Sequence, residues 1–298
     1  MSFYSGHSEG RLLIVHGGAS SRPTDVVKLR SAVLALEAIT QASCDELNRS
    51  GVLDAVVSAL RAMEADPQFN AGLGGAIQAD GQVRVSAGLM DGTRQSFSGV
   101  INALEVMHPS VIAQWLQGQA FRVVSHPVVQ TLARDLKLPA ENLVTPAQLT
   151  DWQQHMSRHS SDTVGCVVRG SNGALAAGTS TGGRESALPG RVSDCATVAG
   201  NYASSVVAVS ATGIGEEIVD DALAARLETR CRDGMSLEAA ARRCYDEAVE
   251  RGRNYGWIAV HRNGEWNAAH TTPSMSFAVR GERGVLQTSE NAPPRDPT

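Results

Sequence analysis

A polar segment meets a buried strand at Ser161-Asp162-Thr163-Val164-Gly165, near the middle of the 298-residue chain. The apolar run over residues 163–168 predicts a strand, and a second strand is predicted over residues 174–181 after a turn at residues 170–173. If the two strands pair as a hairpin, Thr179-Ser180-Thr181 returns to the start of the first strand. The stretch therefore predicts several hydroxyl groups beside one another at the edge of a core.

A threonine hydroxyl becomes a useful nucleophile only when a base lies next to it. One recurring solution makes the threonine the first residue of its own chain, so that its free α-amine is the base. The pKa of an α-amine is roughly 7.7 to 8.0, so it can accept a proton near neutral pH. Here that chemistry requires cleavage between Asp162 and Thr163. An isolated Asp-Thr step is more often part of an ordinary strand, so the hypothesis depends on the other motifs.

The composition indicates a globular protein that does not bind nucleic acid. Hydrophobic residues make up 42% and charged residues 19% of the chain, which allows a sizeable core and argues against global disorder. The net charge is -5, and Lys28 and Lys137 are the only lysines, so the chain has no basic field for phosphates. By length alone, the chain could form one large domain or two smaller ones.

The N-terminus and the cysteines indicate a cytoplasmic protein. Residues 1–10 are polar and lack the basic region and apolar run of a secretory signal, and no apolar run is long enough to cross a bilayer. The five cysteines are an odd number without a CxxC pair, which argues against a disulfide framework and against a zinc knuckle. We therefore predict no membrane partner, and reduced thiols with a structural role.

Strands and helices are predicted in both halves of the chain, in an order typical of an α/β protein. The glycines of His16-Gly17-Gly18-Ala19 predict a tight turn after the first strand. A polar linker is predicted over about residues 139–162, and a disordered Pro-rich tail from Asn291. The predicted strands cover residues 12–15, 83–90, 99–104, 163–168, 174–181, 206–211, 257–261, 266–270 and 276–279. The predicted helices begin at residue 24 or 25 and at residues 52, 110, 126, 146, 216 and 236, and the last two end at residues 230 and 251.

The sequence Gly178-Thr179-Ser180-Thr181-Gly182 matches the G-x-S-x-G nucleophile elbow of α/β-hydrolases. An elbow serine is followed directly by a helix, whereas Gly182-Gly183 and Pro189-Gly190 come next here and break helices. We therefore favour a chance match. A serine hydrolase that uses Ser180 is kept as an alternative hypothesis.

Two further motifs could hold a ligand's charged groups and stabilise developing negative charge. Arg191 and Asp194 lie in one loop, and a guanidinium fork with a carboxylate close by can hold an α-carboxylate and an α-ammonium. A surface salt bridge is the simpler interpretation of the same pair. Thr212-Gly213-Ile214-Gly215 ends a strand and opens a helix, so its hydroxyl and backbone amides could face developing negative charge. Thr212 could equally be the N-cap of that helix.

Taken in chain order, these motifs resemble the plant-type asparaginase and isoaspartyl peptidase family of N-terminal nucleophile hydrolases. The resemblance spans nearly the whole chain, and seven motifs in family order are far more specific than any one of them. It implies a single domain over residues 1–298, folded as a four-layer αββα sandwich. The motifs are His16-Gly17-Gly18-Ala19, Phe69-Asn70-Ala71-Gly72, Met90-Asp91-Gly92, Asp162-Thr163-Val164-Gly165, Thr179-Ser180-Thr181-Gly182-Gly183, Pro189-Gly190-Arg191-Val192 and Thr212-Gly213-Ile214-Gly215-Glu216.

The resemblance also implies how the chain matures. Self-cleavage between Asp162 and Thr163 would give an α chain of residues 1–162 and a β chain of residues 163–298. The two chains would stay together, in a homodimer of such αβ heterodimers. No cofactor would be needed for catalysis.

By the same resemblance, Thr163 attacks the side-chain carbonyl of a β-aspartyl substrate, and Thr181 lies beside it. Thr212 and Gly213 would stabilise the oxyanion. The residues implied to hold or place the substrate and nucleophile are Arg191, Asp194, Gly213, Gly215 and Asn70. A structural sodium ion would be held by the backbone carbonyls of Met63, Glu64, Asp66, Phe69, Ala71 and Leu73, an oxygen-rich set suited to a hard cation.

Departures from the family pattern bear on the substrate. Ser86 stands where the family usually has aspartate, Ala187 where a lysine is common, and Tyr255-Gly256 where two glycines are usual; residues 271–275 match only loosely. These changes favour a β-aspartyl dipeptide over free asparagine, and β-Asp-Arg is one hypothesis for an acidic chain, with weaker asparaginase activity. The alternatives are an L-asparaginase proper, the serine hydrolase, and a non-catalytic relative that binds aspartyl compounds.

Overall fold

The computed structural model describes residues 1–20, 25–154 and 163–290. The predicted cleavage residue Asp162, the end of the polar linker and the tail from Asn291 lie outside these ranges. The described helices are α1 (Val26–Ser50), α2 (Val52–Glu64), η1 (Gly72–Gly74, a 3-10 helix), α3 (Pro109–Leu116), α4 (Val128–Asp135), α5 (Pro146–Gln154), α6 (Gly215–Asp221), α7 (Leu223–Arg232) and α8 (Leu237–Glu250). The described strands are β1 (Ser2–His7), β2 (Leu12–Ser20), β3 (Arg84–Asp91), β4 (Ser96–Leu104), β5 (Val123–Ser125), β6 (Val164–Arg169), β7 (Leu175–Thr181), β8 (Asn201–Ala203), β9 (Val207–Gly213), β10 (Tyr255–His261), β11 (Glu265–His270), β12 (Ser274–Gly281) and β13 (Gly284–Thr288).

The strands form two sheets. The larger has the order β13-β12-β2-β6-β7-β3-β4-β5, and the smaller has the order β1-β11-β10-β9-β8. The strand that follows Thr163, β6, lies in the interior of the larger sheet, between β2 and β7, and is antiparallel to both. The predicted hairpin is confirmed, with Val164 opposite Ser180.

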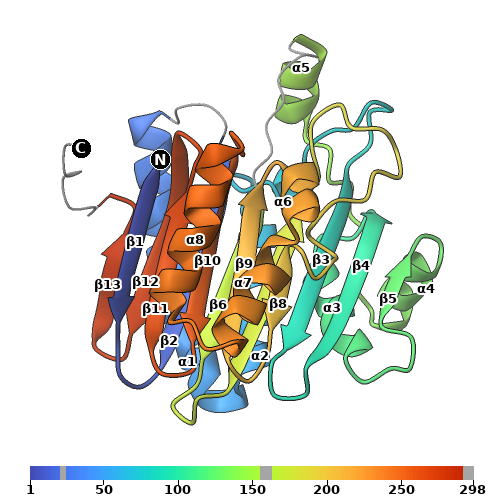
Figure 1. Cartoon of the computed structure of the whole chain (residues 1–298). Coiled ribbons are helices and arrows are strands. Elements are labelled where there is room, and N and C mark those ends of the chain that lie inside the picture. Colours follow the sequence, from blue (N-terminus) through green and yellow to red (C-terminus); the bar gives the residue numbers. More distant parts are fainter. Residues whose placement is uncertain (21–24, 155–162, 291–298) are drawn as a thin grey trace.

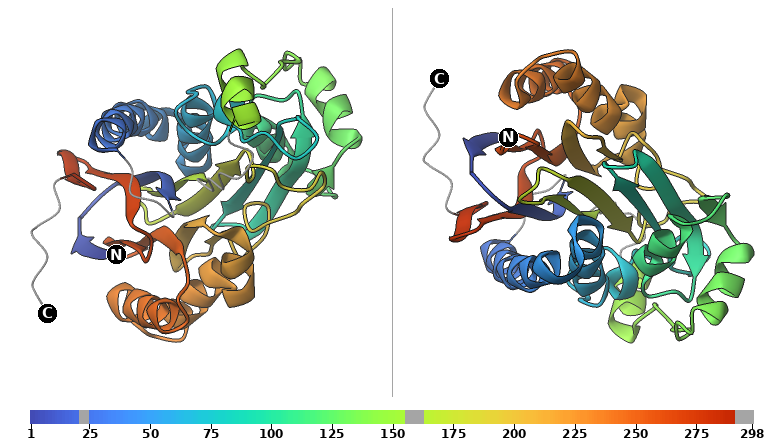
Figure 2. Two further views of the ribbon diagram at one scale, coloured as in Figure 1. Left: turned by 90° about the horizontal axis from the view of Figure 1, so that it is seen from above. Right: turned by 90° about the horizontal axis from the view of Figure 1, so that it is seen from below.

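The sheets pack face to face, and helices cover their outer faces (Figures 1 and 2). The helices α1, α2 and α3 pack on the larger sheet, and α6, α7 and α8 pack on the smaller one. Buried apolar side chains fill the space between the two sheets and the space between each sheet and its helices. The predicted mixed α/β class is confirmed. No helix within the described ranges is both long enough and apolar enough to cross a membrane.

Two predicted helix starts are confirmed by the side chains that cap them. Asp25 precedes α1, and its Oδ1 accepts from the backbone nitrogens of Val27 and Lys28. Ser236 precedes α8, and its Oγ accepts from the backbone nitrogen of Ala239 at 3.2 Å. Each contact satisfies N–H groups that the first turn of a helix leaves without a partner.

The predicted turn at His16-Gly17-Gly18-Ala19 is wrong. The strand β2 continues through these residues to Ser20 and pairs with β12, whose register shifts between Ser276 and Phe277. A Cβ at Gly17 would lie 2.6 Å from the ring of Phe69 and 2.7 Å from Ser276 Oγ. The glycines therefore allow close packing and a bulge inside a strand, a use of glycine that resembles a turn in the sequence.

The helix predicted over residues 216–230 is two helices. Ala222 has a φ of 47°, in the left-handed region, where it ends α6 and begins α7. Apolar residues continue at helical spacing across this point, so the spacing did not reveal the break. The strands β1, β5, β8 and β13 were also not predicted, because they are partly exposed or only three residues long.

Candidate active site

Thr163 directly precedes β6, with both of its reactive groups inside the protein. The residue is 6% exposed, and its Oγ1 donates to Thr181 Oγ1 at 3.1 Å. Its backbone nitrogen donates to Thr212 Oγ1 at 3.2 Å. Thr181 ends β7 of the larger sheet, whereas Thr212 belongs to β9 of the smaller one. The structure thus brings the three threonines together where the two sheets meet.

Thr212 and Gly213 form the side of the site that the smaller sheet contributes. Thr212 is fully buried, and its Oγ1 also accepts from the backbone nitrogen of Ala19 at 3.2 Å. Gly213 has a φ of 131°, a conformation that favours glycine. The N-cap of α6 is Ile214, so Thr212 is not the helix cap that its sequence position also allowed. Its hydroxyl is instead directed at the start of β6.

Asp194 is a buried carboxyl group beside the start of α6. Burial raises the pKa of Asp194 to about 6, against the opposing effects of Ser193 and Arg191. Its Oδ1 accepts from Ser193 Oγ at 2.9 Å, and its Oδ2 has no partner among the described residues. A Cβ at Gly215 would lie 2.5 Å from Asp194 Oδ1 and closer still to Ser193 Oγ. Glycine at position 215 therefore leaves room for the carboxylate.

The guanidinium of Arg191 is held by Glu216 and not by Asp194. Arg191 Nε donates to Glu216 Oε1 at 2.6 Å, and Nη2 donates to Oε2 at 2.8 Å. This two-point contact lowers the pKa of Glu216 to about 2. No ion pair joins Arg191 to Asp194 in the described structure, so the salt-bridge interpretation of that pair is wrong. Ser193 connects the two groups, because its Oγ accepts from Arg191 Nη2 at 3.1 Å and donates to Asp194.

Comparisons with known proteins identify the family of this chain. The family described as "Asparaginase" matches residues 9–290. An isoaspartyl peptidase/L-asparaginase of Synechocystis sp. is 39% identical over 297 residues, which cover 93% of this chain and 90% of that protein. One of Nostoc sp. is 40% identical over 274 residues (85% and 86%), and the plant-type L-asparaginase of Pyrobaculum calidifontis is 31% identical over 287 residues (89% and 95%). The chain belongs to the asparaginase family.

The predicted family and the predicted enzyme class, a hydrolase of the asparaginase type, are thereby confirmed.

Within the candidate site, Asn70 contacts the turn that follows Thr181. Its Nδ2 donates to Gly183 O at 2.8 Å, its backbone oxygen accepts from Gly182 N at 2.9 Å, and its Oδ1 accepts from Ala76 N at 2.9 Å. Asn70 therefore hydrogen-bonds to the two glycines that follow Thr181, and no described hydrogen bond joins it to Thr163.

Ser180 faces away from the other hydroxyls of its motif. Its Oγ donates at 2.7 Å to Oε1 of Glu64, a fully buried carboxylate that also accepts from Ser110 Oγ at 2.8 Å and contacts His108 Nδ1 at 3.2 Å. Side chains alternate along a strand, so Ser180 lies on the opposite face of β7 from Thr181. The geometry gives no support to a serine nucleophile. The side chain of Glu64 was not predicted to have a role, although an acid at the end of an otherwise apolar helix was a usable signal.

A row of buried polar side chains joins the two sheets near Thr163. His16 Nε2 contacts Ser210 Oγ at 3.0 Å, and Ser210 Oγ contacts Thr179 Oγ1 at 2.9 Å. Burial lowers the pKa of His16 to about 3, and the backbone of Thr163 offsets only part of this effect. The imidazole is therefore neutral at physiological pH. Thr179 was predicted to return near Thr163 with the hairpin, and the pairing of β6 with β7 confirms this. Ser210 was not predicted, yet a polar residue inside an otherwise apolar strand is the signal that could have identified it.

The loop between α2 and β3 directs backbone carbonyls toward its glycines. A Cβ at Gly72 would lie 2.2 Å from Glu64 O, and a Cβ at Gly74 would lie 2.0 Å from Phe69 O and 2.7 Å from Pro67 O. Backbone carbonyl oxygens are ligands that suit a hard cation such as sodium, and two of these three, those of Glu64 and Phe69, belong to the predicted set. Phe69 O already accepts from Ala71 N at 2.8 Å. Among the described residues, no group of His, Cys, Asp and Glu side chains could hold a metal.

A cavity adjoins Thr181 and Arg191 on the larger sheet. Ser86, one of the departures from the family pattern, lines it, and its Oγ accepts from Asn102 N at 3.0 Å. Arg84 also lines the cavity and pairs with Asp80 at 2.8 Å, as Arg191 pairs with Glu216. The guanidinium charges at the cavity are thus balanced within the protein.

Proposed function

We propose that this chain is a β-aspartyl dipeptide hydrolase that activates itself by cleavage between Asp162 and Thr163. One observation carries the proposal. The hydroxyl and the backbone nitrogen of Thr163 each contact another threonine hydroxyl, at 3.1 and 3.2 Å. After cleavage that nitrogen is a free α-amine, so nucleophile and base belong to one residue in a buried polar site.

The chemistry follows from this pairing. The α-amine of Thr163 takes the hydroxyl proton while Oγ1 attacks the side-chain carbonyl carbon of the substrate, and the negative charge formed on the oxygen is met by Thr212 and the backbone N–H of Gly213. The C–N bond breaks as the amine returns a proton to the leaving nitrogen. Water then hydrolyses the ester of Thr163 and releases aspartate.

We propose that Asp194 binds the α-ammonium of the aspartyl group and that Arg191 binds its α-carboxylate. Support comes from Asp194 Oδ2, a buried oxygen that lacks a partner within the described residues. An ammonium would satisfy it and restore the charged form of the carboxyl group. Glu216 fixes the guanidinium of Arg191 through Nε and Nη2, so the substrate carboxylate would share or displace that contact.

Several finer expectations belong to the same proposal. The two facing sheets with helices outside them are consistent with a single αββα domain of the N-terminal nucleophile type, and the carbonyl loop with a structural sodium ion. The relatives' names, isoaspartyl peptidase/L-asparaginase, support dipeptide hydrolysis with some asparaginase activity. The leaving residue, for which β-Asp-Arg was one hypothesis, and the homodimer of αβ units remain predictions.

Replacing the nucleophile tests the proposal. We expect Thr163→Ala to stay a single chain of 31.4 kDa and to lose about 10³-fold or more in turnover, because both the hydroxyl attack and the cleavage depend on this residue. Thr163→Ser is the matched control, since it keeps a hydroxyl and should still cleave. Intact mass and aspartate release are measured, with β-aspartyl dipeptides that differ in the leaving residue and with asparagine.

Two outcomes would overturn the proposal. One is full turnover by Thr163→Ala, and the other is a wild-type chain that binds aspartyl compounds but remains intact and releases no product after long incubation. The second outcome would favour the non-catalytic alternative.

A further inference from the structure

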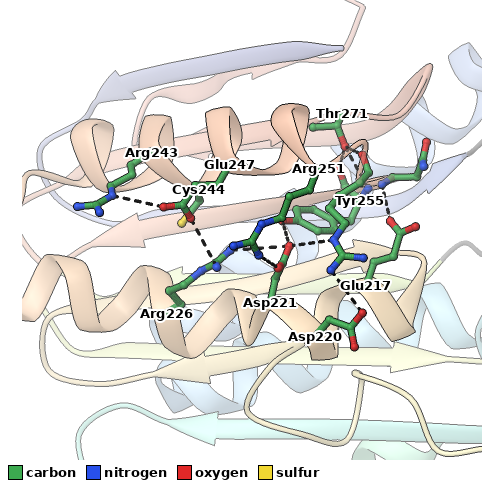
Figure 3. A network of polar contacts seen from close by, with 12 residues as sticks. Glu217, Asp220, Asp221, Arg226, Arg243, Cys244, Glu247, Arg251, Tyr255 and Thr271 are labelled. Atoms are coloured by element: carbon green, nitrogen blue, oxygen red, sulfur yellow. Dashed lines mark hydrogen bonds and ion pairs between the residues drawn. The ribbon is translucent and has the colours of Figure 1, made fainter.

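Tyr255 contacts the candidate site through Gly213, two residues before α6, and also contacts Asp221, the last residue of that helix. It is fully buried at the start of β10, and its hydroxyl donates to Asp221 Oδ2 at 2.7 Å. Asp221 is the last residue of α6, and its side chain is 1% exposed. Figure 3 shows the two side chains meeting within a larger polar network. Tyr255 is also one of the positions at which the chain departs from the family's usual glycines.

Asp221 is a fixed anchor for the tyrosine. Three guanidinium groups surround its carboxylate: Arg251 Nη1 at 2.6 Å, Arg253 Nε at 3.5 Å and Arg226 Nη2 at 3.8 Å. Figure 3 labels Arg251 and Arg226 beside Asp221. A buried carboxylate is stable only when such charges and hydrogen bonds compensate its desolvation. The network therefore holds the end of α6 in one position.

The backbone next to Asp221 carries strain that this network offsets. Ala222 adopts a left-handed conformation, with a φ of 47°, which is unfavourable for a residue with a Cβ. This residue separates α6 from α7, and the chain changes direction there, directly after Asp221, which contacts the tyrosine hydroxyl. Strain of this kind persists where the surrounding contacts over-determine the conformation.

The main chain of Tyr255 packs directly against Gly213. The two residues are opposite each other in the β9–β10 register, and a Cβ at Gly213 would lie 2.5 Å from Tyr255 Cα. One residue further on, Ile214 N donates to Asn254 O at 3.0 Å. Because α6 begins directly after this segment, a closed path runs from Gly213 along α6 to Asp221, and through Tyr255 back to Gly213.

We propose that Tyr255 is a positioning residue that, anchored by Asp221, sets the place of the Gly213 backbone N–H. The proposal rests on the proposed function, in which that N–H faces the oxyanion. A shift of this donor by a fraction of an ångström weakens a bond that strengthens as charge develops, so it raises the barrier more than it weakens substrate binding. No described hydrogen bond joins the tyrosine hydroxyl to Thr163.

Removing one hydroxyl tests the proposal. In Tyr255→Phe the ring remains and the bond to Asp221 is lost, so kcat per cleaved chain should fall by about tenfold, less than the 10²- to 10³-fold typical of deleting an oxyanion donor, while KM changes by less than about twofold. Tyr202→Phe is the matched control. This variant loses the 2.8 Å hydrogen bond from Gln95 Nε2 to the Tyr202 hydroxyl. Tyr202 is in β8, also in the smaller sheet but away from Gly213, so the variant should leave kcat and KM unchanged.

The cleaved fraction of each variant is measured by intact mass, so that a loss of maturation is not counted as a loss of kcat. An unchanged kcat in Tyr255→Phe, or a rise in KM that accounts for the whole loss, would overturn the proposal. If Tyr255→Phe fails to fold or to cleave, Arg251→Gln decides, because the Arg251 side chain is half exposed and, among the described residues, pairs with Asp221 alone. It should lower kcat about two- to threefold at constant KM, and no change would refute the positioning role. An inactive wild-type enzyme would instead refute the proposed function.

Discussion

Asp194 is a buried residue whose carboxyl group is only partly compensated by hydrogen bonds within the described residues. The residue is 3% exposed, and its Oδ2 meets no donor within the described residues. Its raised pKa, about 6 against an ordinary 3.8, means that folding disfavours the charged form. Such a group stabilises the folded state fully below pH 3.8, and that contribution is lost as pH rises through about 6. At neutral pH, the charged Asp194 carboxylate therefore lowers the free energy of unfolding.

We predict that Asp194→Asn stabilises the free protein at pH 7.5 and abolishes dipeptide hydrolysis. A pKa of about 6 instead of 3.8 corresponds to about 3 kcal/mol, and the variant should gain free energy of unfolding of that order at pH 7.5 but almost none at pH 4. Urea unfolding at both pH values measures the difference. Asp233→Asn, at an exposed helix end, is the control and should change stability little. A less stable Asp194→Asn at pH 7.5 would contradict this account.

The residues of the site differ in how far the sequence could predict them. Thr163 and Thr181 follow from the pattern of two strands and a short turn, because antiparallel pairing brings the hairpin ends together. The partner of Arg191 does not follow, because Glu216 is separated from it by β8 and β9 in the chain and reaches it only once α6 is in place. Contacts of this kind depend on tertiary packing and not on local pattern.

At the scale of elements, successive side chains of β7 point to opposite faces of the sheet, so its hydroxyl groups lie in two different environments. Thr181 faces Thr163 and the second sheet, whereas Ser180 faces Glu64 and the helices of the first. The G-x-S-x-G match in the sequence did not distinguish these faces. Only the strand assignment did, since side chains two residues apart share a face and neighbours do not.

We predict that Ser180→Ala retains hydrolysis to within about threefold of wild type and destabilises the fold by about 1 to 3 kcal/mol, because buried Glu64 loses one hydrogen-bond donor. Dipeptide turnover and thermal unfolding measure the two effects. Ser171→Ala, in the exposed turn between β6 and β7, serves as the control. A complete loss of turnover in a folded, cleaved Ser180→Ala would restore the serine-hydrolase hypothesis.

Element boundaries were predictable where a capping residue or a strong apolar period marks them, as at Asp25 and Ser236. Boundaries were not predictable where a glycine can either form a turn or allow close packing inside a strand. His16-Gly17-Gly18-Ala19 resembles a turn, but the strand continues because Phe69 and Ser276 leave no space for side chains at this point. The break at Ala222 was equally unpredictable, because apolar residues keep helical spacing across it, and the residue before it, Asp221, pairs with arginines that are distant in the sequence.

At the scale of the molecule, the strands on either side of Thr163 are interleaved. The larger sheet places β6 and β7, which follow the proposed cleavage, between β2 on one side and β3 on the other, which precede it. The smaller sheet pairs β1 from the N-terminus with β11. Separating the two proposed chains would break backbone ladders in both sheets and expose the apolar clusters between them.

We therefore predict that the cleaved protein remains one particle in native buffer. Size-exclusion chromatography should give a single peak containing equal amounts of residues 1–162 and 163–298, at 31.4 kDa or a multiple of it, whereas denaturing electrophoresis should separate the two fragments. Uncleaved Thr163→Ala is the control and should elute at the same volume, because cleavage removes no strand pairing. Fragments that separate without denaturant would contradict the interleaved sheet order as the force that holds them together, and a cleaved protein eluting differently from Thr163→Ala would mean that maturation also changes the assembly.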